Sequence, residues 1–288
     1  MSGSVLGILM YIFIGPLVGG LLAGFDRKVT ARMQGRQGPP LLQPFYDVLK
    51  LFSKEITAVN YAQDFFIVVY FLLIVFTGSL FFSGGDILLV IFALTLASIF
   101  LVLGAFAANS PYSSIGAMRE LVQMMAYEPM VLLYAVGLYK VTGSFMVKDI
   151  LNSPQPVLLY LPGIFLGFTY ILTIKLRKSP FDLSMSHHGH QEIVKGLTTE
   201  FSGGMLALIE VSHWYENVFL MGFVYLFFSW SWPGSKVLAL GACIILYFFE
   251  ILIDNAFARA KWQLMLKASW LIAAVLGFVN LLVLYIIK

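Results

Sequence analysis

Long apolar runs alternate with polar connections along the whole chain. Eight of these runs are about long enough to cross a bilayer as a helix, which takes about 20 mainly apolar residues. The runs are continuous rather than alternating, which favours helices over a β-barrel because a helix satisfies its own backbone hydrogen bonds. The pattern predicts an all-α, polytopic membrane protein with about eight transmembrane helices, near residues 4–25, 65–83, 86–108, 120–141, 157–176, 204–231, 236–258 and 268–287.

The connection after the first run has a helical pattern of its own. In "GPPLLQPFYDVLKLFSKE", residues 38–55, apolar positions recur at helical spacing and charged residues fall on the other faces. The segment is too short and too charged to span a bilayer. It therefore predicts a cytoplasmic amphipathic helix at the membrane surface. A packed surface helix that only braces its neighbours remains an open alternative.

Composition supports a membrane protein. Hydrophobic residues make up 60% of the chain and charged residues 11%, with a mean hydropathy of +0.88. A soluble domain has about 25% charged residues, so this chain cannot hide its apolar surface within itself. The sequence shows no internal repeat, low-complexity segment or detachable linker. Residues 1–288 are therefore predicted to form a single integral membrane domain in contact with the lipid bilayer.

Lysine and arginine are unevenly distributed between the two sides that eight spans define. Of the 18 basic residues, only Lys140, Lys148, Lys236 and Lys288 lie on one side. The positive-inside rule then places the long polar connections in the cytoplasm and both termini outside a cell membrane. The net charge of +3 reflects this topology, and no nucleic-acid partner is expected.

Cys243 is the single cysteine and falls within the seventh apolar run. One thiol excludes an internal disulfide, a CxxC pair and a cysteine-ligated iron–sulfur cluster within this chain. Redox chemistry is therefore expected in another subunit. No catalytic, metal-binding or cofactor-binding residue is predicted here.

Ionisable residues inside the apolar runs are the strongest chemical signal. A charge near the bilayer centre costs about 2.5–3.5 kcal/mol on insertion scales, so such residues should face protein or water. They are Glu128, Glu210, Glu216, Glu250 and Asp254. Glu210, His213 and Asn217 share one helical stripe. Glu250 and Asp254 lie one turn apart, where repulsion and burial favour a proton on one of them.

The fourth run adds Glu120 and Tyr127 close to Glu128. Pro129 follows directly and cannot donate a helical hydrogen bond, which predicts a kink and a local water pocket near Met125. Protonatable groups placed in this way suit a proton relay. A structural role, with each carboxylate bonded to lysine, arginine, tyrosine or backbone groups, is the alternative. The number of buried acids favours the relay.

The connection "KSPFDLSMSHHGHQEIVKGLTTEFSGG", residues 178–204, is the longest strongly polar stretch. His187, His188 and His190 could bind a metal ion, since imidazole suits zinc, nickel or iron. Their spacing fits no recognised site, and the connection has no cysteine. A docking surface for a partner subunit is the favoured interpretation.

Three motifs in this sequence resemble those of one family. The polar connection holds Lys178, Pro180, Phe181, Asp182 and Leu183, then Glu192, Ile193, Val194, Gly196, Glu200, Phe201 and Gly203. "LLQPFYDVLKLFSKE" and "RELVQMMAYE" supply the other two. They are similar to the membrane subunit of respiratory complex I that joins the peripheral arm to the membrane arm, called subunit 1 or the H subunit. The resemblance covers about residues 10–285.

Departures from the family pattern indicate a branch. Quinone-using members carry acidic residues where this chain has Ser186, His187, His188, Gly189 and His190, and their first loop is longer. Both differences resemble the membrane-bound, energy-converting [NiFe] hydrogenases and their archaeal sulfur-reducing relatives. The family's membrane glutamate aligns near His213, with Glu210 and Glu216 on either side, so which group takes that role stays open.

The resemblance implies a non-catalytic coupling subunit of a ferredoxin-linked, hydrogen-evolving complex. Its implied partners are a hydrogenase-like large subunit, an iron–sulfur small subunit and antiporter-like membrane subunits. The iron–sulfur clusters and the NiFe centre are expected in those partners. Proton relay or coupling is assigned to Glu120, Glu128, Glu192, Glu200, Glu210, His213, Glu216, Glu250 and Asp254, and partner docking to Asp182, His187, His188 and His190.

Two alternatives remain at this point. The chain could be the equivalent subunit of a quinone-linked or sulfur-linked oxidoreductase. It could also be a stand-alone ion transporter, against which stands the absence of an internal repeat and of discontinuous helix pairs.

Overall fold

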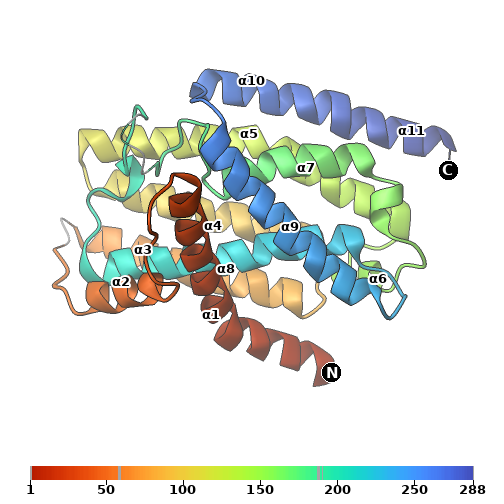
Figure 1. Ribbon diagram of the computed structural model, residues 1–288, viewed down its shortest axis with the longest axis horizontal. Coiled ribbons are helices and arrows are strands. Elements are labelled where there is room, and N and C mark those ends of the chain that lie inside the picture. Colours follow the sequence, from red (N-terminus) through yellow and green to blue (C-terminus); the bar gives the residue numbers. More distant parts are fainter. Residues whose placement is uncertain (1, 58–59, 187–188, 190, 288) are drawn as a thin grey trace.

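A computed structural model describes residues 2–57, 60–186, 189 and 191–287. Most helices run roughly parallel to the long axis of the molecule, whereas α1 and α9 cross the others obliquely (Figure 1). The helices are α1 (Ser2–Met33), α2 (Gln43–Phe52), α3 (Tyr61–Phe82), α4 (Ile87–Ala107), α5 (Pro111–Thr142), α6 (Val147–Leu151), α7 (Pro162–Lys175), α8 (Gly203–Phe228), α9 (Ser235–Ala256), α10 (Trp262–Ile272) and α11 (Val279–Ile287). Two 3-10 turns, η1 (Val157–Leu159) and η2 (Gly196–Thr198), and a π-helical segment, η3 (Ala273–Phe278), complete the regular structure.

The protein is an all-α, polytopic membrane protein, as the sequence predicts. Strands are absent from the described residues, which contain only two isolated backbone bridges. Within the described ranges, six helical stretches are long and apolar enough to cross a membrane: α1, α3, α4, α5, α9 and the continuous segment from α10 to α11. The connections after α1, α4, α7 and α9 gather at one end of the bundle, here named the loop face. The connections after α3, α5 and α8 form the opposite face.

Two predicted spans differ from the expectation. The run at 157–176 is helical as α7 only from Pro162 to Lys175, or about 21 Å at 1.5 Å per residue. Pro162 begins the helix, and Asn280 Oδ1 of α11 accepts hydrogen bonds from its first amides, at 3.0 Å from Gly163 N and 3.1 Å from Ile164 N. A residue distant in the sequence therefore fixes where α7 begins. α8 has 26 residues, but polar side chains occupy its half nearer the loop face.

The first helix is also longer than the sequence predicts. α1 continues through the charged residues 26–33 and ends at Met33. These extra turns are held by contacts outside the helix: Arg27 pairs with Asp47 of α2 at 2.6 Å, and Asn255 Nδ2 donates to Thr30 Oγ1 at 3.2 Å. A hydrophobicity count cannot include such partners, which lie far along the chain.

α2 confirms the predicted amphipathic helix. Its Pro44 and Val48 are buried, while Leu49 is 65% exposed. The Phe45 ring packs on Trp214 of α8 with 5.0 Å between ring centroids. One face of α2 therefore braces α8, and other apolar side chains stay on the outer surface.

α5 runs as continuous helix through Pro129, which leaves the carbonyl of Met125 without its usual i+4 donor. Trp270 Nε1 of α10 donates to that carbonyl at 3.0 Å. A side chain thus fills the position for which the sequence predicts a water pocket.

Removing this donor should destabilise the protein modestly. We expect Trp270→Phe to cost about 1 kcal/mol, the usual net value of one hydrogen bond. The effect should largely disappear in a Pro129→Ala background, because an alanine amide can satisfy the Met125 carbonyl. Thermal unfolding of the four proteins in detergent measures this double-mutant cycle, and an equal cost in both backgrounds would contradict the assignment.

Candidate functional site

Buried charged side chains and the central aromatic cluster occupy different halves of the bundle. Towards the opposite face the centre is aromatic: Tyr134, Phe168, Phe223 and Phe227 pack together, with 4.9 Å between the ring centroids of Tyr134 and Phe227. Towards the loop face the centre is charged. The candidate site is therefore the half of the bundle nearer the loop face.

Glu216 of α8 is the centre of the first group of charges. Its carboxylate lies 3.1 Å from Lys175 Nζ and 4.0 Å from Arg177 Nη2, and its side chain is only 7% exposed. Arg177 also contacts the His213 ring, and Lys175 Nζ lies 4.2 Å from the centre of the Tyr127 ring. Two cations at the end of α7 thus neutralise one buried acid, which offsets its desolvation.

Glu120 of α5 joins this group to the polar connection. Its Oε2 accepts hydrogen bonds from Ser184 Oγ and from Gln123 Nε2, the latter at 3.2 Å. Ser184 belongs to the segment between α7 and α8 and is fully buried. We name Glu120, Lys175, Arg177, His213 and Glu216 the buried charge cluster.

A second ion cluster, consisting of Asp26, Lys178 and Asp254, joins α1, α9 and the polar connection. Lys178 pairs with Asp26 and lies 3.7 Å from Asp254, and the amide of Ser179 donates to Asp254 Oδ1 at 2.7 Å. One turn earlier on α9, Glu250 is fully buried, and neither of its oxygens has a hydrogen-bond partner among the described residues. Of this pair, Asp254 is therefore bound by a cation and by a backbone amide, whereas Glu250 is enclosed without such partners.

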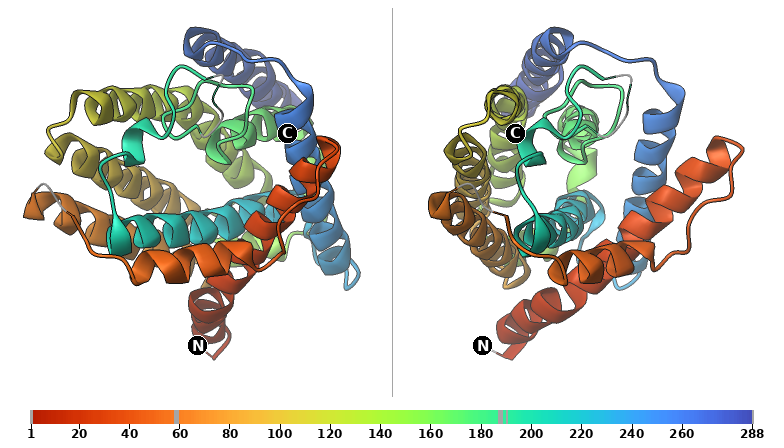
Figure 2. Two further views of the ribbon diagram at one scale, coloured as in Figure 1. Left: turned by 60° about the vertical axis from the view of Figure 1, so that its left-hand side comes forward. Right: turned by 90° about the vertical axis from the view of Figure 1, so that its left-hand side faces the viewer.

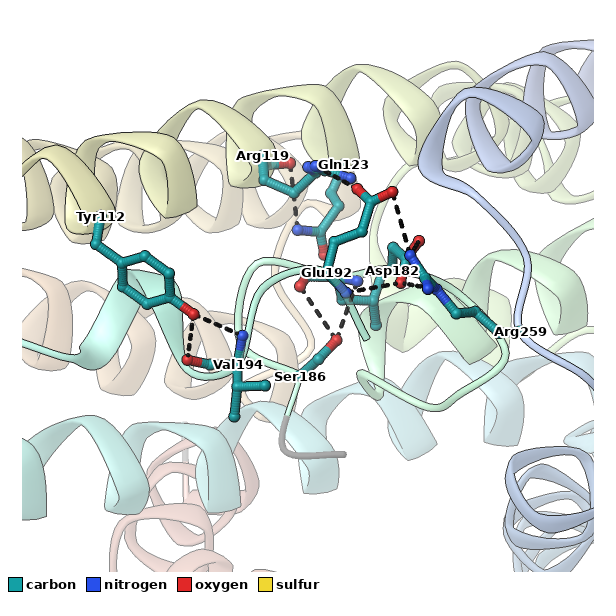
Figure 3. Close-up of polar contacts among 9 residues, drawn as sticks. Tyr112, Arg119, Gln123, Asp182, Ser186, Glu192, Val194 and Arg259 are labelled. Carbon is teal, nitrogen blue, oxygen red and sulfur yellow. Dashed lines mark hydrogen bonds and ion pairs between the residues drawn. The ribbon is translucent and has the colours of Figure 1, made fainter. Parts of the chain in front are cut away.

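The polar connection is fastened to the bundle by four charged side chains, here named the loop anchor: Arg119, Asp182, Glu192 and Arg259 (Figure 3). Arg259 binds Asp182 with two parallel hydrogen bonds of 2.8 and 2.9 Å. Glu192 bridges Arg259 and Arg119, at 3.1 Å from each. The hydrogen bonds that Arg259 donates to Asp182 and the charges of both carboxylates raise the pKa of Arg259. The connection is therefore tied at once to α5 and to the segment between α9 and α10.

Backbone contacts support the same attachment. Tyr112 of α5 both accepts from the amide of Val194 and donates to its carbonyl, at 2.9 and 3.0 Å. A Cβ on Gly116 would lie 2.4 Å from Leu197 N, so only glycine lets η2 approach α5 this closely. Gly203 begins α8 with a φ of +53°, which a glycine adopts without strain. In Figure 2 the connection lies across the middle of the loop face.

The structure brings some predicted site residues together and separates others. Glu120, His213 and Glu216 meet in the buried charge cluster, and Asp182 and Glu192 meet in the loop anchor. Glu210 shares the predicted helical stripe with His213, but its side chain lines a pocket outside the buried charge cluster. That pocket, about 260 Å³, lies between α2 and α8, and Arg27, Lys50, Lys54 and Lys195 also line it.

Glu128 lies at the edge of the buried charge cluster, whereas Glu200 stands apart from both ion clusters. Glu128 is half-buried beside a small cavity of about 20 Å³ that Lys175 also lines. The backbone carbonyl of Glu200 accepts a hydrogen bond from Gln63 Nε2 at 3.1 Å. His187, His188 and His190 lie outside the described residues, so the docking and metal hypotheses for them stay predictions. Among the residues that are described, none form a group of three or more acids, histidines or cysteines able to hold a metal ion.

Sequence reasoning missed the cations that complete these clusters. In the sequence, Lys175, Arg177 and Arg259 count only as charges that set the topology. Lys178 and Arg119 also belong to the family motifs, but no partner is assigned to them. A usable signal exists nevertheless. Buried acids require compensation, and these basic residues lie at the ends of apolar runs that carry or face those acids.

These features define a class: a polytopic, all-α membrane subunit whose charged interior is connected to a folded polar segment on one face. The family model described as NADH dehydrogenase matches residues 6–285. The chain belongs to this family, that of complex I subunit 1, and is the membrane subunit of a complex I-like oxidoreductase.

Relatives come from several kinds of complex. The chain is 31% identical to NADH-ubiquinone oxidoreductase chain 1 of Paracentrotus lividus, over 93% of this chain and 90% of that protein. It is 28% identical to hydrogenase-4 component C of Escherichia coli, over 87% of each. Among solved structures, it is similar to a chain of the membrane-bound sulfane sulfur reductase, an archaeal respiratory membrane complex. The TM-score is 0.84 at 25% identity, covering 96% of this chain and 99% of that one.

Proposed function

We propose that this chain is the membrane-anchoring and coupling subunit of a ferredoxin-linked, hydrogen-evolving [NiFe] hydrogenase complex. Electrons pass through iron–sulfur clusters of a small subunit to the NiFe centre of a large subunit, and neither group belongs to this chain. The polar connection, on the cytoplasmic side, binds that redox module. Antiporter-like membrane subunits receive the signal that this chain transmits.

One observation supports the coupling role above others. The five residues 175–179, where α7 ends and leads into the polar connection, supply Lys175 and Arg177 to Glu216 on α8 and Lys178 to Asp254 on α9. A displacement of the connection therefore changes the surroundings of two buried carboxylates on different helices at once. Ser184, further along the same connection, does the same for Glu120.

The charge distribution also favours a coupling subunit over a stand-alone transporter. Beyond Glu216, the buried residues of α8 towards the opposite face are apolar, including Phe219, Phe223 and Phe227. In the described part of the chain, the buried charged groups thus occupy one half of the bundle. Moving one charge against 100 mV costs about 2.3 kcal/mol, and that free energy comes from the redox step in the partner subunits.

Two observations favour the hydrogenase branch: the Ser-His-His-Gly-His segment at 186–190 and the likeness to hydrogenase-4 component C over most of both chains. The likeness to a chain of the sulfane sulfur reductase complex supports a second candidate, a sulfur-linked complex of the same architecture. The two candidates share the coupling role and differ in the terminal acceptor.

Purification of the intact complex through a tag on this chain separates the candidates. Mass spectrometry identifies the partners, metal analysis measures nickel, and ferredoxin-driven assays measure hydrogen and sulfide. A nickel-containing complex that evolves hydrogen is the expected result. A nickel-free complex that forms sulfide or reduces quinone would replace the hydrogenase assignment, and recovery of the chain alone, still moving ions, would refute the coupling role.

The relay hypothesis for Glu128 and Glu210 has its own test. We expect Glu128→Gln and Glu210→Gln, made singly, to leave assembly intact and to abolish ion uptake coupled to hydrogen production, because an amide cannot exchange a proton. Glu55→Gln, a change of an exposed carboxylate on the loop face, is the matched control. Wild-type uptake by both variants in proteoliposomes would remove these residues from the relay.

A further inference from the structure

An apolar groove lies between α1 and α9, with α8 as its floor. Its volume is about 650 Å³, within the range of about 300–1,000 Å³ found for small-molecule sites. Side chains from five helices line it, including Leu22, Phe81, Val147, Leu226, Cys243 and Tyr247. This groove is separate from the buried charge cluster and from the loop anchor, which use none of these residues.

The groove is closed at the loop face and open towards the opposite face. Near the loop face, Gln34 Nε2 donates to Asn255 Oδ1 at 3.1 Å, and Tyr247 donates to the carbonyl of Leu22 at 3.3 Å, so α1 and α9 are held together there. Their N-terminal ends lie apart in Figure 1. The lining residues of α9 run from Leu240 to Tyr247, about 10 Å at 1.5 Å per residue.

Two lysines border the open end. Lys148 lies between the lining residues Val147 and Leu151, and a Cβ on the lining residue Gly84 would be 3.0 Å from Lys148 Cβ. Lys236 precedes the lining residue Leu240 by one helical turn, so both share a face of α9. Both lysines are exposed, and neither ammonium group has an ion pair or hydrogen bond with another described residue.

The carboxylates nearest to this end in the sequence are already engaged. Asp149 accepts from Ser144 Oγ at 2.7 Å, and Asp86 caps α4 through the amides of Leu88 and Leu89. The end of the groove therefore has an uncompensated positive charge. Trp232, 55% exposed and stacked on Trp230, is typical of the boundary between lipid and water.

We propose that this groove binds one anionic phospholipid, with an acyl chain between α1 and α9 and the phosphate between Lys148 and Lys236. An acyl chain matches the apolar lining, and a phosphate matches the two lysines. A neutral isoprenoid would leave both charges without a partner.

Native mass spectrometry of the intact complex, released from nanodiscs of phosphatidylglycerol and phosphatidylcholine, tests this site. We expect one phosphatidylglycerol to be retained per copy of this chain. Retention should fall about tenfold or more in Lys148→Gln/Lys236→Gln, the scale expected for the loss of two contacts between lysine and an anionic headgroup. Lys140→Gln, which removes a lysine of the same face that does not line the groove, is the control.

A second variant tests the acyl-chain position. Cys243→Phe places a ring inside the groove and should displace the lipid while both lysines remain. The proposal fails if phosphatidylcholine is retained equally well, if no lipid is retained, or if neither variant lowers retention. Photo-crosslinking from position 240 that captures a partner protein instead of lipid would likewise overturn it. Because both lysine substitutions are on the surface, they test the site even if Cys243→Phe does not fold.

Discussion

Replacing Lys175 by methionine is expected to destabilise the protein by about 3–5 kcal/mol, the cost of leaving one member of a buried ion pair without its partner. Lys175 and Glu216 are 8% and 7% exposed, so water cannot replace the lost ammonium group. Arg177, at 4.0 Å, compensates Glu216 only in part. Thermal unfolding of the complex in detergent measures the loss.

The double variant Lys175→Met/Glu216→Gln distinguishes charge from packing. It removes both charges, so we expect it to regain most of the stability that the single variant loses. Lys267→Met changes an exposed lysine of α10 and should have little effect. If the double variant is no more stable than Lys175→Met, the loss comes from packing of the lysine stem, and the pair is not the stabilising element.

The same double variant tests the coupling role. With Glu216 neutral and Lys175 removed, the complex should assemble and produce hydrogen but lose coupled ion uptake. This outcome separates a charge that only stabilises the fold from one that also transmits the redox signal. Full ion uptake by a stable double variant would confine Glu216 to a structural role.

Asp182→Asn is expected to release the polar connection from the bundle. The amide keeps the shape of the side chain but loses the charge-assisted pair of hydrogen bonds with Arg259, which are stronger than neutral ones. Cleavage of residues 178–202 by a protease should become about tenfold faster, the change that about 1.4 kcal/mol of local stability produces. Limited proteolysis of the complex in detergent measures the rate.

Release of the connection should also weaken attachment of the redox module. The hydrogenase-like large subunit should be lost from Asp182→Asn during purification, and Arg259→Lys should behave similarly because an ammonium group cannot form the paired contact. Lys261→Gln, two residues from Arg259 and exposed, is the matched control. If cleavage accelerates while the large subunit is retained, the connection is held by the anchor but does not dock the partner.

The sequence shows where the glycines of the family motif lie, but only the structure shows why glycine is needed there. Gly196 and Gly116 face each other closely enough that a Cβ on Gly196 would lie 3.3 Å from Gly116 Cα, and 80 residues separate them. No local pattern contains that contact.

Other parts of the site were predicted from local rules alone. The cost of a bare charge in hydrocarbon identified Glu216, Glu250 and Asp254 as residues that face protein, and all three are at least largely buried. The helical spacing of apolar residues predicted α2 correctly, because the residues that an amphipathic helix buries lie on one face and recur at that spacing. The same reasoning placed Glu210 with His213 on one stripe, yet their side chains reach different surroundings, since neighbouring helices decide what each meets.

The sequence by itself determined the all-α membrane class, the approximate spans, the amphipathic helix and the acids that need compensation. Each of these follows from composition or from spacing within a single helix. The tertiary structure alone decided that Lys175 and Arg177 compensate Glu216, that Lys178 joins α1 to α9, and that Asn280 fixes where α7 begins. The physical reason is that a buried charge or an unpaired amide is satisfied by whichever group the fold brings within a few ångströms, and those groups come from distant parts of the chain.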